Sequence, residues 1–223
     1  MKKILLLLCI VISFVSCQSE RGDLKFKQKA LNWEKIKILA LWDSITYWYK
    51  VKSEKSYPSQ LEKKLQENNY KYSIKNFGVS WNTSSQLLER LDDILENNQA
   101  DIAILCIWWN DGLRKKSLSN MKENIEKIIQ KLEAKNIHIV FVWMELPIIF
   151  GWDYSSDFAD TFSSIAEEKQ LDFYPYLLEW IWLSVEYNQS DNIHPTALWY
   201  TLISDNIYNF LEDMQLLYKK EEN

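Results

Sequence analysis

The sequence predicts an α/β protein in which a parallel sheet of five strands lies between two layers of helices. From residue 35 onward, short apolar segments alternate with longer segments that have helical periodicity. The apolar segments have the length of strands and are apolar almost throughout, as strands buried on both faces are. Strands that alternate with helices in this way form a parallel sheet that is covered on both faces.

Five segments have the length and composition of buried strands. The third of them, with the sequence DIAILCIW, is the clearest because it holds only one charged residue. The predicted strands are 35–42, 72–79, 101–108, 137–144 and 171–174. The carboxyl ends of parallel strands lie at one edge of the sheet, and ligands bind outside that edge. We therefore expect the functional residues to follow the strands.

Five segments between and after these strands have the apolar spacing of amphipathic helices. In the second of them, Leu87, Leu91 and Leu95 fall on one face, and Thr83 or Ser84 is placed to cap the first turn. The predicted helices are 57–69, 83–98, 117–135, 155–169 and 195–216. Their lengths are those of helices that cross over between parallel strands.

The composition departs from that of an ordinary globular protein in one respect. A chain of this length with average composition would hold roughly 16 glycines, whereas this one holds 4, together with 11 tryptophans. The net charge is −5, and the basic residues are scattered rather than gathered on a face that could bind nucleic acid. No His or Cys spacing suits a metal site, and no phosphate-binding or dinucleotide motif is present. We therefore expect no nucleic-acid partner, no metal and no cofactor.

The first 17 residues have the pattern of an export signal. Lys2 and Lys3 precede an apolar run that is too short for a transmembrane helix. The run ends at Ser16 and Cys17, and this junction resembles the lipobox of bacterial lipoproteins, although Phe14 stands where leucine is usual. We expect Cys17 to be lipidated and to anchor the protein at the outer face of the cell membrane. An ordinary cleaved signal, which would release a periplasmic or extracellular protein, is the alternative.

The chain then divides into four parts. Residues 1–16 are the predicted lipoprotein signal peptide, and residues 17–34 have the polar and charged composition of a tether. Residues 35–217 contain all the predicted strands and helices and form one domain, and residues 218–223 form a charged tail. Cys106 lies alone in an apolar strand, so no disulfide framework is expected.

Asp191 and His194 point to hydrolytic chemistry. Because they are three residues apart, they can share one turn in which the carboxylate orients the imidazole, and such a histidine can deprotonate a serine hydroxyl. The chain has only two histidines, and His138 begins a strand and is interpreted as structural. His194 is therefore the candidate base if the chain is a hydrolase. Taken alone, this short motif is common and also fits a capped turn.

Four blocks in a fixed order are more specific than any one of them. Each lies at the carboxyl end of a predicted strand or just before the last helix. They are WDS at 42–44, NFGVSWNT at 76–83, WWNDGLR at 108–114 and DNIHP at 191–195. With these blocks, residues 36–215 resemble the GDSL/SGNH hydrolases, in the branch of thioesterase I, lysophospholipase L1 and arylesterase. The resemblance implies a flavodoxin-like three-layer α/β/α sandwich.

The resemblance also implies a mechanism and its residues. Ser44 is the expected nucleophile, His194 its base, and Asp191 the carboxylate that orients the base. The backbone N–H groups of Ser44 and Trp81 and the side chain of Asn110 are expected to form the oxyanion hole. A serine esterase of this kind would hydrolyse carboxylic ester, thioester or lysophospholipid substrates through an acyl-enzyme. A carbohydrate acetyl-ester deacetylase with the same site is the alternative within enzymes.

Most of the tryptophans stand where this family carries glycine. A left-handed backbone costs a non-glycine residue roughly 1–2 kcal/mol, and extra bulk in a packed site costs about 1–3 kcal/mol. Nine such sites would exceed a typical stability of about 5–15 kcal/mol. We interpret these tryptophans as UGA codons that encode glycine in the source organism. If they are real, the chain would be a non-catalytic surface lipoprotein with a filled cleft. The positions are 42, 48, 81, 108, 109, 143, 180, 182 and 199, with Trp33 and Trp152 undecided.

Overall fold

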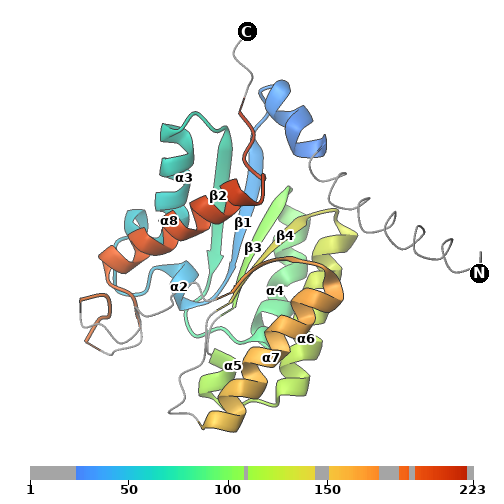
Figure 1. Ribbon diagram of the computed structural model, residues 1–223, viewed down its shortest axis with the longest axis vertical. Helices are drawn as coiled ribbons and strands as arrows, with labels where there is room; N and C mark the ends of the chain where they lie inside the picture. Colours follow the sequence, from blue (N-terminus) through green and yellow to red (C-terminus); the bar gives the residue numbers. More distant parts are fainter. Residues whose placement is uncertain (1–23, 108–109, 144–150, 176–185, 191–193, 220–223) are drawn as a thin grey trace, which may run out of the picture.

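The computed structural model describes residues 24–107, 110–143, 151–175, 186–190 and 194–219, which fold into three layers (Figure 1). The strands form one parallel sheet in the order β2-β1-β3-β4-β5. They are β1 (Ile36–Trp42), β2 (Tyr72–Gly78), β3 (Ile102–Ile107), β4 (His138–Trp143) and β5 (Asp172–Tyr174). The predicted α/β fold with a five-stranded parallel sheet is confirmed, and each strand lies within one residue of its predicted bounds.

Helices cover both faces of the sheet. On one face α3 packs against α8, and on the other α6 packs against both α4 and α7 (Figure 1). The bounds are α3 (Tyr57–Glu67), α4 (Ser84–Asn97), α6 (Leu118–Ala134), α7 (Trp152–Lys169) and α8 (Ala197–Asp213). Three short elements that the periodicity did not predict are α2 (Ser44–Tyr47), α5 (Asn110–Leu113) and a 3₁₀ turn, η1 (Ser53–Lys55).

The core lies between the sheet and its two helical layers. Leu87, Leu91 and Leu95 of α4 are buried, as their spacing predicts. β1, β2 and β3 end at the same level, because Trp42 of β1 pairs with Gly78 of β2 on one side and with Cys106 of β3 on the other. The segments that follow β1, β2 and β3 therefore meet at one place, and α2 and α5 lie at this carboxyl edge.

Part of the predicted tether belongs to the folded domain. Residues 24–31 form a helix, and its Phe26 and Ala30 are buried. The Phe26 ring meets the rings of His138 and Tyr218 at centroid distances of 5.7 and 6.4 Å. The predicted boundary at residue 35 is therefore corrected, because two apolar residues four apart share a helix face that packs on the domain.

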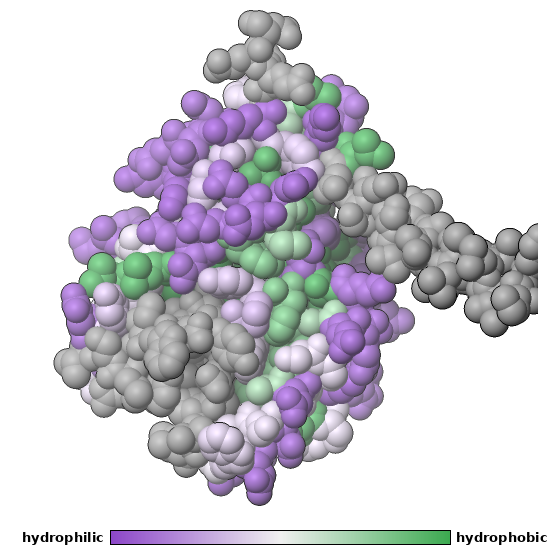
Figure 2. All heavy atoms as spheres, in the orientation of Figure 1, coloured by the Kyte–Doolittle hydropathy of each residue, from purple (hydrophilic) through white to green (hydrophobic). Residues whose placement is uncertain are grey.

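The surface over the helices is polar, and both ends of the chain lie outside the described residues. The face shown in Figure 2 is mostly hydrophilic over its helices, as expected for amphipathic helices with one buried side. Within the described ranges, no helix is both long and apolar enough to span a bilayer. The predicted signal peptide and Cys17 lie outside the described residues, as do residues 220–223 of the predicted tail.

Candidate active site

Ser44 is the first residue of α2, directly after β1 ends, and it is buried. Asp43 caps this helix, because its Oδ1 accepts a hydrogen bond from the Ile45 N–H at 3.0 Å. Gly78, at the end of β2, lies against the same turn. A Cβ on Gly78 would lie 2.3 Å from the backbone nitrogen of Tyr47, so only glycine permits this approach. The turn that carries Ser44 is thus seated directly on the neighbouring strand.

Asn76 fixes this turn from β2. Its Nδ2 donates to the Thr46 carbonyl oxygen at 2.5 Å, and its Oδ1 accepts from the Gly78 N–H at 2.8 Å. The Asn76 side chain therefore connects the carboxyl end of β2 to α2. Asn76 begins the second of the four blocks, and the structure gives this asparagine a positioning contact.

Asn110 begins α5 after β3 and is buried. Its Nδ2 donates to Asp43 Oδ2 at 3.0 Å and to the Asn82 carbonyl oxygen at 2.9 Å. Both hydrogens of this amide are thereby engaged, so one of these bonds must open before Asn110 can hold an oxyanion. Burial raises the pKa of Asp43 to about 8, so the strength of its bond to Asn110 depends on pH near neutrality.

Two backbone N–H groups belong to the turns that follow β1 and β2. The hydrogen bonds of the described residues leave the N–H groups of Ser44 and Trp81 without an acceptor. The Trp81 carbonyl oxygen, in contrast, accepts from Nη2 of Arg114 at 3.0 Å, which fixes the turn between β2 and α4. Unpaired N–H groups at a helix start and in a fixed turn are suited to hold an anion. The assignment of an oxyanion hole to them stays a prediction.

His194 lies just before α8 and is only 1% exposed. Its ring centroid is 4.1 Å from that of Tyr49 and 5.3 Å from that of Trp81. The Tyr49 N–H donates to the Ser44 carbonyl oxygen at 3.3 Å, and the Tyr200 hydroxyl donates to the same oxygen at 3.4 Å. The structure thus brings the predicted base beside the turn that carries the predicted nucleophile.

Asp191, the third predicted catalytic residue, lies outside the described residues. The second histidine, His138, is placed far from Ser44 at the start of β4. Its Nε2 lies 2.6 Å from Oδ2 of Asp172 on β5, so it joins two strands at the amino edge of the sheet. This contact agrees with its structural interpretation.

Several residues that support the site were not predicted from the sequence. Arg90 on α4 donates from Nε to Asn82 Oδ1 at 2.8 Å and from Nη2 to the Trp42 carbonyl oxygen at 3.0 Å. The Asn82 carbonyl oxygen in turn accepts from Asn110, so one chain of bonds connects the segments at the carboxyl ends of β1, β2 and β3. Asp43 could have been predicted from the sequence, because it is adjacent to Ser44 in the block WDS. Arg90 carried no such signal, because a charged residue in an amphipathic helix is usually solvated.

Among the described residues, four tryptophans have a positive φ angle, which is uncommon for any residue other than glycine. The φ angles are 55° for Trp33, 118° for Trp42, 76° for Trp48 and 65° for Trp81. The angle of Trp42 lies beyond the left-handed helical region, and its buried indole nitrogen has no hydrogen-bond partner in the described part of the chain. Glycine adopts all four conformations freely. The backbone therefore supports glycine at these positions.

The remaining tryptophans divide into two groups. Trp143, Trp152 and Trp199 have ordinary φ angles, so their backbone makes no demand for glycine. The other four predicted positions, 108, 109, 180 and 182, lie outside the described residues. Trp33, which the sequence left undecided, joins the strained group because it follows the helix at 24–31, where its N–H donates to the Ala30 carbonyl oxygen at 3.0 Å.

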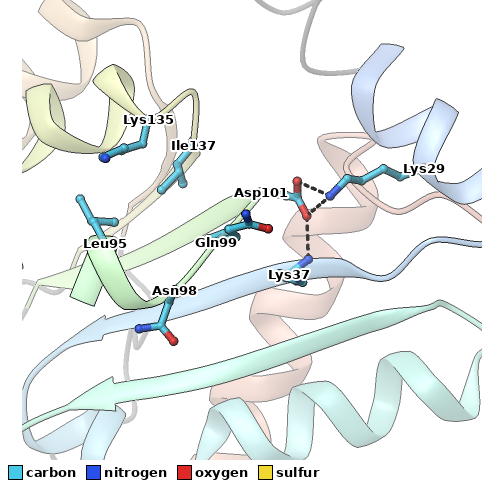
Figure 3. A pocket seen from close by; sticks show the side chains of 9 residues that line it. Lys29, Lys37, Leu95, Asn98, Gln99, Asp101, Lys135 and Ile137 are labelled. Atoms are coloured by element: carbon cyan, nitrogen blue, oxygen red, sulfur yellow. Dashed lines mark hydrogen bonds and ion pairs between the residues drawn. The ribbon is translucent and has the colours of Figure 1, made fainter. Parts of the chain in front are cut away.

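A pocket of about 330 Å³ lies at the opposite, amino edge of the sheet and contains none of the predicted site residues (Figure 3). The Asp101 carboxylate in it accepts from Lys29 Nζ at 2.6 Å and from the Lys37 N–H at 2.9 Å. Burial alone would raise the pKa of Asp101, but these bonds outweigh it and the pKa is lowered. The pocket therefore holds a satisfied ion pair. Among the described residues, no group of three or more His, Cys, Asp or Glu side chains could hold a metal.

Comparisons with known proteins agree with this geometry. Residues 40–202 match the model of the GDSL-like lipase/acylhydrolase family. An arylesterase of Vibrio mimicus is 30% identical over 159 residues, which cover 71% of this chain and 80% of that protein. The thioesterase 1/protease 1/lysophospholipase L1 of Escherichia coli strain K12 is 28% identical over 158 residues, or 71% of this chain and 74% of that one.

Solved structures show the same architecture. The psychrotrophic esterase EstA from Pseudoalteromonas sp., in a structure inhibited by monoethylphosphonate, superposes with a TM-score of 0.77 at 25% identity. The superposition covers 81% of this chain and 98% of that one. A structure of TesA gives a TM-score of 0.76 at 24% identity, over 80% and 99% of the two chains.

Proposed function

Because the chain belongs to the GDSL-like lipase/acylhydrolase family and is an ester-bond hydrolase, we propose that it cleaves its substrates through an acyl-enzyme on Ser44. His194 takes the proton from the Ser44 hydroxyl as the oxygen attacks the ester carbonyl, and Asp191 orients the imidazole. The acyl group passes to Ser44, the alcohol or thiol leaves with the proton from His194, and water then releases the acid. The contact of the Tyr49 ring with His194, together with the bond from Tyr49 to Ser44, carries the proposal.

The developing oxyanion is held by the N–H groups of Ser44 and residue 81 and by the Asn110 side chain. Within the described part of the chain neither N–H group has an acceptor, which supports this part of the proposal. Asn110 contributes when its amide exchanges the bond to Asp43 or to Asn82 for one to the oxyanion. Donors of this kind each contribute about 100- to 1,000-fold to the rate.

The substrate is a small ester, and we propose aryl esters, thioesters or lysophospholipids as the class. The support comes from the relatives, which are named as an arylesterase and as a thioesterase and lysophospholipase. We further propose export and lipid attachment at Cys17, on the pattern of residues 1–17. Radiolabelled fatty acid should enter the protein in its native host and should be absent from a Cys17→Ala variant. Equal labelling of the two would rule out this anchor.

The active form carries glycine at the nine positions where the family has it. With tryptophan at position 81, the indole packs edge-on against His194 at 5.3 Å and narrows the space that the substrate carbonyl must enter. This contact favours a second candidate for the chain as written, a surface protein with a filled cleft and no catalysis. The gene decides between them, since UGA codons at the nine positions support glycine and UGG codons exclude it.

The experiment compares the chain as written with the chain carrying glycine at the nine positions, each with and without Ser44→Ala. We expect the glycine chain to hydrolyse chromogenic esters and to lose at least about 1,000-fold in kcat/KM on Ser44→Ala. Ser163→Ala, at an exposed position of α7, is the matched control and should leave kcat/KM unchanged. An alkyl phosphonate should label Ser44 in a mass-spectrometric peptide map. Hydrolysis that survives Ser44→Ala would overturn the assignment of the nucleophile.

A further inference from the structure

Gln189 holds the loop that carries His194. Its Nε2 donates to the Tyr49 carbonyl oxygen at 2.8 Å and to the Pro195 carbonyl oxygen at 2.7 Å. Its backbone N–H donates to the His194 carbonyl oxygen, also at 2.8 Å. An antiparallel bridge between Asn188 and Pro195 lies beside these bonds. The Gln189 amide therefore bonds within its own loop, to Pro195 six residues away, and across to Tyr49, 140 residues away in the chain.

Tyr49 contacts both the loop of His194 and the turn of Ser44. Its carbonyl oxygen is held by Gln189, its N–H donates to the Ser44 carbonyl oxygen at 3.3 Å, and its ring packs on His194 at 4.1 Å with an interplanar angle of 35°. His194 itself lies outside any helix or strand, so regular secondary structure does not fix its imidazole. The contacts with Tyr49 and Gln189 connect it to the turn of Ser44.

We propose that Gln189 is a positioning residue that places the His194 imidazole relative to Ser44. It acts by joining the loop of the base to the segment that follows the nucleophile. The inference rests on the proposed function, in which Ser44 and His194 are nucleophile and base. A misplacement of about 1 Å between reacting groups costs about 100-fold in rate, so a single amide that sets this spacing has a large effect on kcat.

The first test is Gln189→Met, which keeps the length of the side chain and removes both donors. It is made in the chain that shows Ser44-dependent hydrolysis. We expect kcat to fall about 10- to 100-fold and KM to stay within about twofold, because Gln189 acts through His194 and not on the substrate. Gln130→Met, at an exposed position of α6, is the control and should leave both constants unchanged. An unchanged kcat in folded Gln189→Met overturns the proposal.

A second variant tests the coupling to Tyr49. Tyr49→Leu removes the ring from His194 but keeps the carbonyl oxygen that Gln189 binds. Because both residues act on the same imidazole, the double variant should lose less activity than the product of the two single losses. Losses that multiply would show two independent effects and contradict the proposal. If Gln189→Met fails to fold, the same cycle is measured with Gln189→Glu and Tyr49→Leu, and it then replaces the first test.

A third measurement does not depend on activity. The chain has only two histidines, so His138→Gln assigns both imidazoles in an NMR titration. We expect Gln189→Met to shift the titration of His194 and to leave that of His138 unchanged. If the parent hydrolyses esters after Ser44→Ala, the proposed function fails. If the parent depends on Ser44 while Gln189→Met changes neither kcat nor the titration of His194, only this inference fails.

Discussion

The amino and carboxyl edges of the sheet both contain positive-φ positions and a buried carboxyl group, but different residues occupy and surround them. At the amino edge, helices end in left-handed turns at Asn69, Asn136 and Gln170. Asparagine in particular is enriched in this conformation. The buried Asp101 of this edge is paired with Lys29. The left-handed turns at Asn69 and Asn136 and the buried charge of Asp101 thus meet residues suited to them, whereas Trp33, which follows the helix at 24–31, is an exception at this edge.

The carboxyl edge is different. Three of its positive-φ positions carry Trp42, Trp48 and Trp81, with lysine at two others. Its buried Asp43 has only amide donors and no cation among the described residues. Strained backbone and shifted pKa values are found together at functional sites, and next to Ser44 the positive φ angle of Trp42 occurs beside the raised pKa of Asp43. The tryptophans at positive φ and the buried carboxyl group without a cation are two separate departures from the pattern of the amino edge. The first disappears if glycine stands at these positions, and the second belongs to the site itself.

The largest difference between the two edges is expected in kcat/KM when an asparagine of each edge is replaced by alanine. Asn110→Ala, at the carboxyl edge, should lower kcat/KM by about 100- to 1,000-fold, the usual loss for one oxyanion donor. Asn98→Ala, in the pocket of the amino edge, should change it less than about twofold. Steady-state hydrolysis of one chromogenic ester measures both. Full activity in Asn110→Ala would remove this residue from the oxyanion hole.

The two buried carboxyl groups should give opposite dependences of stability on pH. Burial raises the pKa of Asp43 from 3.8 to about 8, so the folded state binds more protons between these values and the free energy of unfolding falls as pH rises from about 4 to 8. The pKa of Asp101 is lowered, so its contribution is present above about pH 4 and is lost as pH falls through its folded pKa. The Asp43 effect is on the order of a few kcal/mol.

Urea unfolding at a series of pH values measures this difference. Asp43→Asn should flatten the decline between about pH 5 and 8, whereas Asp101→Asn should flatten only the loss below about pH 4. Parallel profiles for the wild type and Asp43→Asn would show that Asp43 ionises normally. The contrast between the edges would then rest on the tryptophans alone.

The smallest effect concerns the backbone. Trp48→Gly and Trp81→Gly relieve left-handed conformations at partly exposed positions, and each should raise the free energy of unfolding by about 1 kcal/mol. Asn136→Gly, with a φ angle of 54° at the amino edge, should change it by less than about 0.5 kcal/mol. Urea midpoints at constant pH measure all three. If the two tryptophan variants lose stability, the native chain prefers the indoles.

The sequence was sufficient for the sheet because its signal is local. Residues 101–108 are apolar enough to be recognised as a buried strand, and three of the four blocks fall at strand ends because ligand-binding segments of such sheets do. The helix at 24–31 was missed because Phe26 and Ala30 are its only buried residues in a polar context. The four-residue helices α2 and α5 are too short to show periodicity.

The supporting contacts of the site could not be predicted for a different reason. Arg90 bonds to the end of β1, 48 residues away, and Gln189 bonds to Tyr49, 140 residues away. Such bonds depend on the relative placement of whole elements, which no local pattern encodes. The φ angles of the tryptophans likewise required a backbone, and they extended the glycine interpretation to Trp33.

Gly78 has a consequence for how the site responds to distant change. It presses the end of β2 onto α2 with no room for a single carbon atom between the two backbones. β2 is one of the two outer strands of the sheet. Because Gly78 has no side chain that could rearrange, a change in the position of this strand end must be matched by the backbone of α2, which begins at Ser44.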